Sequence, residues 1–159
     1  MSNPPRPPQK NYQQGRPPSG APRPAQSGSL HACFKKGIGA QSELMDLAQV
    51  FAQDLVNGRT PVKHHQLRLL LDNAIRLKQS HKEGLEHAVT ATTMGRLASI
   101  RPRIAYMAAR ERGLHALQVE LDLVLKDKEL FKTGADIDRL YEFVAAVVAY
   151  HRYEEANRN

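Results

Sequence analysis

Residues 136–154 constrain the fold more than any other stretch, because they are apolar around most of a helical circumference. Their apolar side chains recur at steps of three and four, which predicts an α-helix. Such a helix buries much of its surface, and we expect it to be the core helix. Its apolar stripe consists of Ile137, Leu140, Tyr141, Val144, Val147 and Val148, widened by Phe143 and Tyr150.

Further amphipathic stretches with the same period predict additional helices. We expect these helices over residues 42–57, 60–82, 85–100 and 114–126. Ser42 is a favourable N-cap, and Thr60 followed by Pro61 is typical of a helix start. No stretch alternates apolar and polar residues for long enough to indicate a β-strand. The sequence therefore predicts an all-α fold, a single compact bundle of about five helices.

The segment over residues 96–113 combines this helical pattern with five arginines and a single acid. Arg103 and Arg110 are seven residues apart and share a face, while apolar residues point elsewhere. Pro102 either begins a new helix here or kinks a continuous one. A guanidinium group forms two parallel hydrogen bonds to phosphate oxygens, so a row of arginines suits a polyanion. The alternative is a solvated face on a core helix.

Residues 1–28 hold eight of the ten prolines, which block regular structure and predict a flexible tail with polyproline II character. Residues 30–40 are ambiguous, with Phe34 and Ile38 as candidates for packing on the domain. We place a disordered basic tail over residues 1–40 and a helical domain over residues 41–159.

The positive charge is segregated along the chain. Residues 1–40 contain six bases and no acid, and residues 59–112 contain eleven bases against four acids. This pattern favours an anionic partner. The single cysteine, Cys33, excludes a disulfide framework within the chain, and the lack of a long apolar run argues against export and membrane spanning. We expect a cytoplasmic protein.

The motifs of familiar enzymes are missing from the sequence. We find no glycine-rich phosphate loop, nucleophile elbow, carboxylate pair or histidine–glutamate metal motif. His64 and His65 are adjacent and would point about 100° apart on a helix, so they cannot chelate one metal ion together. We expect no catalytic residue, no metal and no cofactor. The best enzymatic alternative is a histidine phosphotransfer bundle with His81 or His87 as phosphoacceptor.

The distribution of aromatic residues indicates how such a chain would bind nucleic acid. The basic block over residues 59–112 contains one aromatic residue, Tyr106. Proteins that grip single strands usually interleave aromatics with positive charge, and no helix-turn-helix pattern is present. This favours contacts to the backbone of a strand whose sequence is read by base pairing.

Three blocks in the same order resemble the small helical subunit of type III-A CRISPR effector complexes, the Csm complex. They are PVKHHQLRLLLDNA, SIRPRIAYMAAR and FVAAVVAYHRY, and the resemblance spans residues 62–153. It implies an all-helical, noncatalytic subunit that stacks in a minor filament beside the guide RNA and its paired target RNA. Target cleavage would belong to the repeat-recognising main-filament subunits, and nucleotide cyclisation to the large polymerase-like subunit.

The same resemblance makes residues 41–159 an RNA-binding and assembly domain and implies the residues that bind RNA. They are Lys63, Gln66 and Arg68 in the first block and Arg101, Arg103 and Arg110 in the second. His151, in the third block, is expected to be structural. Leu69 stands where the first block usually has a base, and the Pro-rich tail is not part of the family pattern. The rival interpretation is a protein–protein adaptor bundle whose basic face meets an acidic partner.

Overall fold

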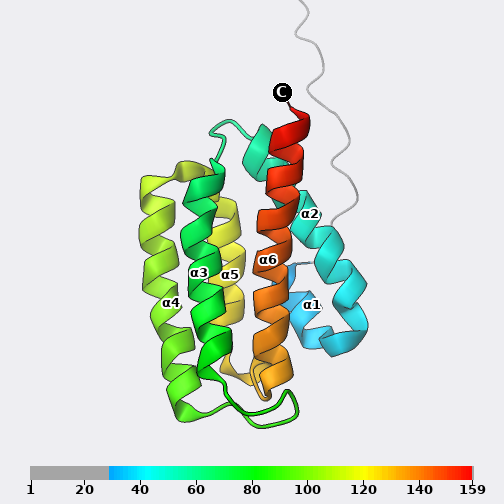
Figure 1. Ribbon diagram of the computed structural model, residues 1–159, viewed down its shortest axis with the longest axis vertical. Coiled ribbons are helices and arrows are strands. Elements are labelled where there is room, and N and C mark those ends of the chain that lie inside the picture. Colours follow the sequence, from blue (N-terminus) through cyan, green and yellow to red (C-terminus); the bar gives the residue numbers. More distant parts are fainter. Residues whose placement is uncertain (1–28, 159) are drawn as a thin grey trace, which may run out of the picture.

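The computed structural model describes residues 29–158, and the tail expected over residues 1–28 lies outside the described residues (Figure 1). Over this range the chain is helical and contains no β-strand, which confirms the all-α prediction. The helices are α1 (Leu30–Lys36), α2 (Gln41–Asn57), α3 (His64–Ser80), α4 (Ala91–Arg110), α5 (His115–Lys126) and α6 (Gly134–Asn157). Short 3₁₀ turns, η1 (Gly37–Ala40), η2 (Arg112–Leu114) and η3 (Lys128–Leu130), connect some of them.

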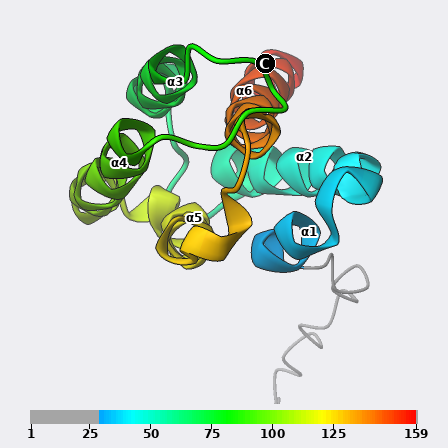
Figure 2. The ribbon, with the colours of Figure 1, turned by 90° about the horizontal axis from the view of Figure 1, so that it is seen from below.

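Seen end-on, the helices form a closed ring around the core (Figure 2). Helix α6 lies between α2 and α3, α4 packs between α3 and α5, and α1 closes the ring between α5 and α2. Phe143 and Val147 of α6 are completely buried, as the apolar circumference of that segment predicts. His151, on the same helix, is also completely buried and lies 2.7 Å through Nε2 from the Val62 carbonyl oxygen. Its expected structural role is confirmed.

The predicted start of the second helix at Thr60 and Pro61 is wrong, because α3 begins at His64. The chain before it is held extended by tertiary contacts of Val62, which is buried. The Val62 amide donates to the Leu55 carbonyl at 2.8 Å, and its carbonyl faces His151. Packing at one residue therefore overrides the local signal for a helix start.

The third helix also starts later than predicted. Residues 81–90 form a loop, and α4 begins at Ala91 with Thr90 as its N-cap. The loop crosses to the start of α6, where the Gly134 and Ala135 amides donate to its carbonyls at 3.0 and 2.9 Å. These bonds occupy backbone groups that a helix over this segment would have used internally. We call residues 81–90 the strap.

Pro102 lies inside α4, which runs without interruption over 20 residues. The structure therefore selects one continuous helix over a helix that begins at Pro102. Proline has no N–H to donate, so one bond of the helical ladder is missing at this point. The arginines on both sides of Pro102 consequently belong to the same helix.

Residues 29–40 lie within the stretch assigned to the tail, and they form α1 and η1. Phe34 is buried, whereas Ile38 is 77% exposed, so only the first of the two packing candidates reaches the core. The guanidinium of Arg139 on α6 donates to the Cys33 and Phe34 carbonyls at 3.1 and 3.5 Å. This buried side chain caps the last turn of α1, and burial lowers the pKa of its guanidinium.

Candidate nucleic-acid interface

A groove between α3 and α4, which lie side by side in Figure 1, collects most of the arginines of α4. Arg96, Arg103 and Arg110 follow one another at seven-residue steps and line the groove from the α4 side. Leu69 and Arg76 line it from α3. The groove consists of adjoining hollows with volumes of about 200, 450 and 240 Å³. We call it the α3–α4 groove.

Arg103 is positioned by a buried amide on the opposite wall. Its Nη1 donates to the Asn73 Oδ1 at 2.9 Å, and the Asn73 Nδ2 donates to the Leu69 carbonyl at 2.9 Å. Asn73 is only 5% exposed, so this amide is fixed by the packing of the helix pair. A guanidinium has five N–H donors, and those of Arg103 not used by Asn73 remain available to a ligand.

The other arginines of the groove are not neutralised by an ion pair with an acid. Within residues 29–158, neither Arg76, Arg96 nor Arg110 forms an ion pair. The Arg110 guanidinium instead lies 5.9 Å from the centroid of the Tyr106 ring. Unpaired guanidinium groups along one groove create a positive potential suited to an anionic chain.

Arg101 points away from this groove, towards α5. Its Nε and Nη2 donate to the two carboxylate oxygens of Asp122 at 2.8 and 3.2 Å. This bidentate pair holds the pKa of the Asp122 carboxyl below its usual value and raises the pKa of Arg101. The structure thus separates Arg101 from Arg103 and Arg110, although all of them come from the same sequence block.

A comparison with protein families identifies the family of this helical chain. The family model described as Csm2 Type III-A matches residues 39–157, which include all of α2 to α6. The chain belongs to this family. It is therefore a noncatalytic small subunit of the type III-A CRISPR complex, a defence system. Comparisons with curated proteins and with solved structures give no match.

Of the expected RNA-binding residues of this Csm2 family member, Gln66, Arg103 and Arg110 line the α3–α4 groove. The Gln66 Oε1 also accepts a hydrogen bond from the Lys63 amide at 2.6 Å, which caps the first turn of α3. The Lys63 side chain lines a separate hollow of about 530 Å³ near the end of α6. Arg68 is exposed on α3 and lies outside the groove.

Two groove arginines were not among the expected RNA-binding residues. Arg96 stands seven residues before Arg103, so extending the step from Arg103 to Arg110 backwards would have found it. Arg76 belongs to a four-residue ladder with Arg68 and Asp72, and this spacing is compatible with mutual neutralisation. Among the described residues the ladder forms no ion pair.

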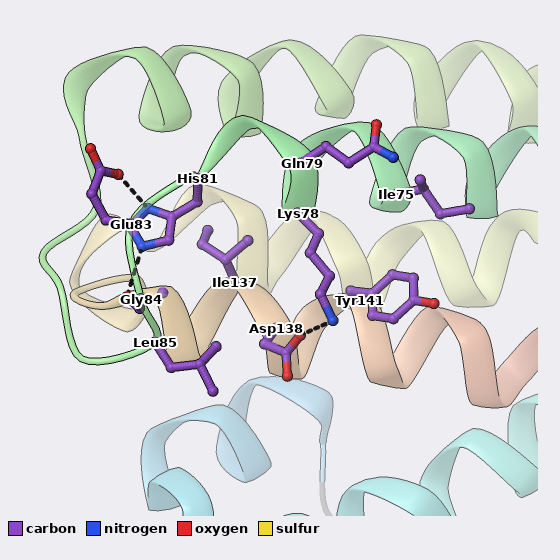
Figure 3. Close-up of a pocket in the computed structure, with 11 residues that line it drawn as sticks. Ile75, Lys78, Gln79, His81, Glu83, Gly84, Leu85, Ile137, Asp138 and Tyr141 are labelled. Carbon is purple, nitrogen blue, oxygen red and sulfur yellow. Dashed lines mark hydrogen bonds and ion pairs between the residues drawn. The ribbon is translucent and has the colours of Figure 1, made fainter.

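His81, one of the two phosphoacceptor candidates, lies in another hollow of about 580 Å³ between α3, the strap and α6 (Figure 3). Its side chain is 4% exposed, with Nε2 at 3.3 Å from the Gly84 carbonyl and Nδ1 at 3.6 Å from the Glu83 carboxylate. Gly134 makes room for the ring, because a Cβ there would lie 2.5 Å from His81 Nε2. The imidazole is therefore a packed link between the strap and α6.

Over residues 29–158, no three side chains of histidine, cysteine, aspartate or glutamate are grouped so that they could hold a metal ion. In that same range, no helix is both long and apolar enough to cross a membrane.

Proposed function

We propose that this Csm2 family member binds the sugar–phosphate backbone of guide and target RNA through the α3–α4 groove. The observation that carries the proposal is the row of Arg96, Arg103 and Arg110 on one face of α4, facing Arg76 across the groove. Arginine forks match phosphate oxygens. Contacts of this kind position a strand without reading its sequence, and base pairing between guide and target supplies the sequence reading.

The other expected RNA-binding residues extend this interface to different degrees. Arg68 is exposed on the same helix as Gln66 and adds positive charge outside the groove, whereas Lys63 is exposed just before that helix and lines the separate hollow near the end of α6. Arg101 contributes less, because Asp122 already neutralises its charge. The proposed order of importance places Arg103 and Arg110 first, Arg76 and Arg96 next, and Arg101 last.

The assembly partners of the proposal are the other subunits of the complex. Copies of the chain stack in a minor filament, beside the repeat-recognising main-filament subunits and the large polymerase-like subunit, in a cytoplasmic ribonucleoprotein. The resemblance of the three sequence blocks supports this arrangement. The concentration of positive charge on α3 and α4 also supports this arrangement. Other faces of the molecule carry exposed acids such as Asp46 and Asp54, and these faces remain for contacts with protein subunits.

Affinity purification of the full chain from its native host, followed by sequencing of the RNA that accompanies it, tests membership of an RNA-containing complex. We expect short RNAs of discrete length that carry CRISPR repeat tags. Recovery of an acidic helical partner without RNA at moderate salt would instead support the adaptor interpretation, in which the arginines form a protein interface.

Replacement of Arg103 and Arg110 by glutamine tests the groove directly. Each lost phosphate contact should flatten the dependence of log affinity on log salt by about 0.7 to 0.9, and binding should weaken alike for all RNA sequences. The matched control is Lys128→Gln, which removes an exposed charge from η3, outside the groove. An equal loss in the control, or a loss confined to certain sequences, would contradict the proposal.

A further inference from the structure

The α3–α4 groove contains an exposed aromatic side chain that a purely electrostatic interface does not need. Tyr106 is 63% exposed, although it lies on the helix that carries the arginine row. Its ring stacks on no other aromatic ring among residues 29–158, and the guanidinium of Arg110 lies over it. A large exposed aromatic surface of this kind marks a place where a flat partner can bind.

Tyr106 lines two adjoining hollows of the groove. On one side lies the hollow of about 240 Å³ that contains Arg110. On the other side lies the hollow of about 450 Å³, to which Pro102 adds apolar surface. Leu69 lines both hollows. Leu69 is itself 53% exposed, so apolar walls from both helices are open to solvent at this point.

The edges of the larger hollow carry polar groups of both kinds. Arg76 and Arg103 supply N–H donors, and the carboxylate of Asp72 supplies acceptors. Asp72 forms no ion pair within the described part of the chain. A nucleobase has the matching surface, because it combines an apolar face with hydrogen-bond donors and acceptors on its edge.

We infer that the hollow between Tyr106, Leu69 and Pro102 holds one unpaired nucleobase of the RNA whose phosphates bind the arginine row. This inference rests on the proposed function and deepens it. The base stacks on the face of Tyr106 opposite Arg110, while Arg103 and Arg76 contact the flanking phosphates or the base edge. The groove is lined by four arginines and only two acids, which gives it an excess of positive charge. This charge favours RNA over a protein segment as the occupant. The arginines are Arg76, Arg96, Arg103 and Arg110, and the acids are Asp72 and Glu111.

Binding of the full-length chain to three RNAs with equal numbers of phosphates tests the inference. The first is a duplex with one bulged nucleotide, the second has an abasic bulge at the same position, and the third is a continuous duplex. At low ionic strength we expect the base-containing bulge to bind about tenfold more tightly than the other two, a typical effect of stacking one base on an aromatic side chain.

Three variants assign that preference to the tyrosine. Tyr106→Ala should abolish the tenfold preference, so that the three RNAs bind alike, whereas Tyr106→Phe should keep the preference. The matched control is Tyr153→Ala on α6, since Tyr153 is 62% exposed and lies outside the groove. It should behave like the wild type. Circular dichroism melting would verify that each variant is folded.

The possible outcomes separate this inference from the proposed function. Equal affinity of the wild type for all three RNAs would overturn the nucleobase site and leave the backbone interface standing. A bulge preference that survives in Tyr106→Ala would also overturn it. If the full chain bound none of the RNAs even at low ionic strength, both the inference and the proposed function would fall.

Discussion

The two sides of the helical ring use their positively charged side chains in opposite ways. Around α1, α2 and α6 three cations are engaged: Lys36 pairs with Glu43 at 2.7 Å, and Arg139 and Arg158 donate to main-chain carbonyls. Along the α3–α4 groove, Arg96 and Arg110 form no ion pair within the described chain. The first group stabilises the fold, whereas the second leaves its charge for a partner. Residue type alone does not distinguish the two groups.

The largest expected effect comes from exchanging an aromatic residue on each side for alanine. Phe143→Ala removes a completely buried ring from α6, and we expect the free energy of unfolding to fall by about 3–5 kcal/mol. Tyr106→Ala removes an exposed ring and should change it by less than about 0.5 kcal/mol. Denaturation by urea measures both. A large destabilisation by Tyr106→Ala would show that the groove side is part of the core after all.

A smaller and sharper comparison concerns two arginines of the same helix. Arg103→Gln should weaken RNA binding about tenfold, because a hydrogen bond to a charged group typically contributes about 1.5–3 kcal/mol. Arg101→Gln should change it less than about twofold, since that charge is already paired with Asp122. Titration of both variants with the same RNA duplex provides the measurement, and the reverse ranking would place the RNA on the α5 side of α4.

The smallest effect is the pH dependence of the Arg101–Asp122 pair. Hydrogen bonds from Arg101 lower the pKa of the Asp122 carboxyl in the folded state. The pair therefore stabilises the protein above the unfolded carboxyl pKa of about 3.9, and this contribution is lost as the pH falls through the folded pKa. We expect Asp122→Asn to cost less than about 0.5 kcal/mol at neutral pH, because both groups are partly exposed.

Unfolding curves of wild type and Asp122→Asn at several pH values would check this prediction. The difference in stability should shrink towards zero under acidic conditions. A difference that grows on acidification would mean that the variant acts through another contact, such as the packing between α4 and α5.

The sequence predicted the helices wherever a long amphipathic period was uninterrupted. Helix α2 differs from its expected range by one residue at the start, and the core position of α6 was correct. The misplaced helix starts near Thr60 and Leu85 have a common cause. In both segments backbone groups bond outside the segment, Val62 to Leu55 and to the His151 side chain, and the strap to Gly134 and Ala135. A local pattern of caps and apolar residues contains no information about such partners.

The candidate site was predictable in part for a related reason. The seven-residue step between Arg103 and Arg110 located one face of α4, and the structure extends the same face to Arg96. The pairing of Arg101 with Asp122 depends on how α4 and α5 pack. No spacing rule reveals that partner, which lies 21 residues away in sequence.

The strap also has a consequence for the order of folding. Its bonds join Leu85 and His87 to Ala135 and Gly134, and thereby close a loop of chain that contains α4 and α5 entirely. Closing a long loop costs more conformational entropy than joining neighbouring helices, and contacts between distant residues slow the search for the native state. We therefore expect α4 and α5 to associate first and the strap to close last. The arginine row would then be in place before the ring around the core is complete.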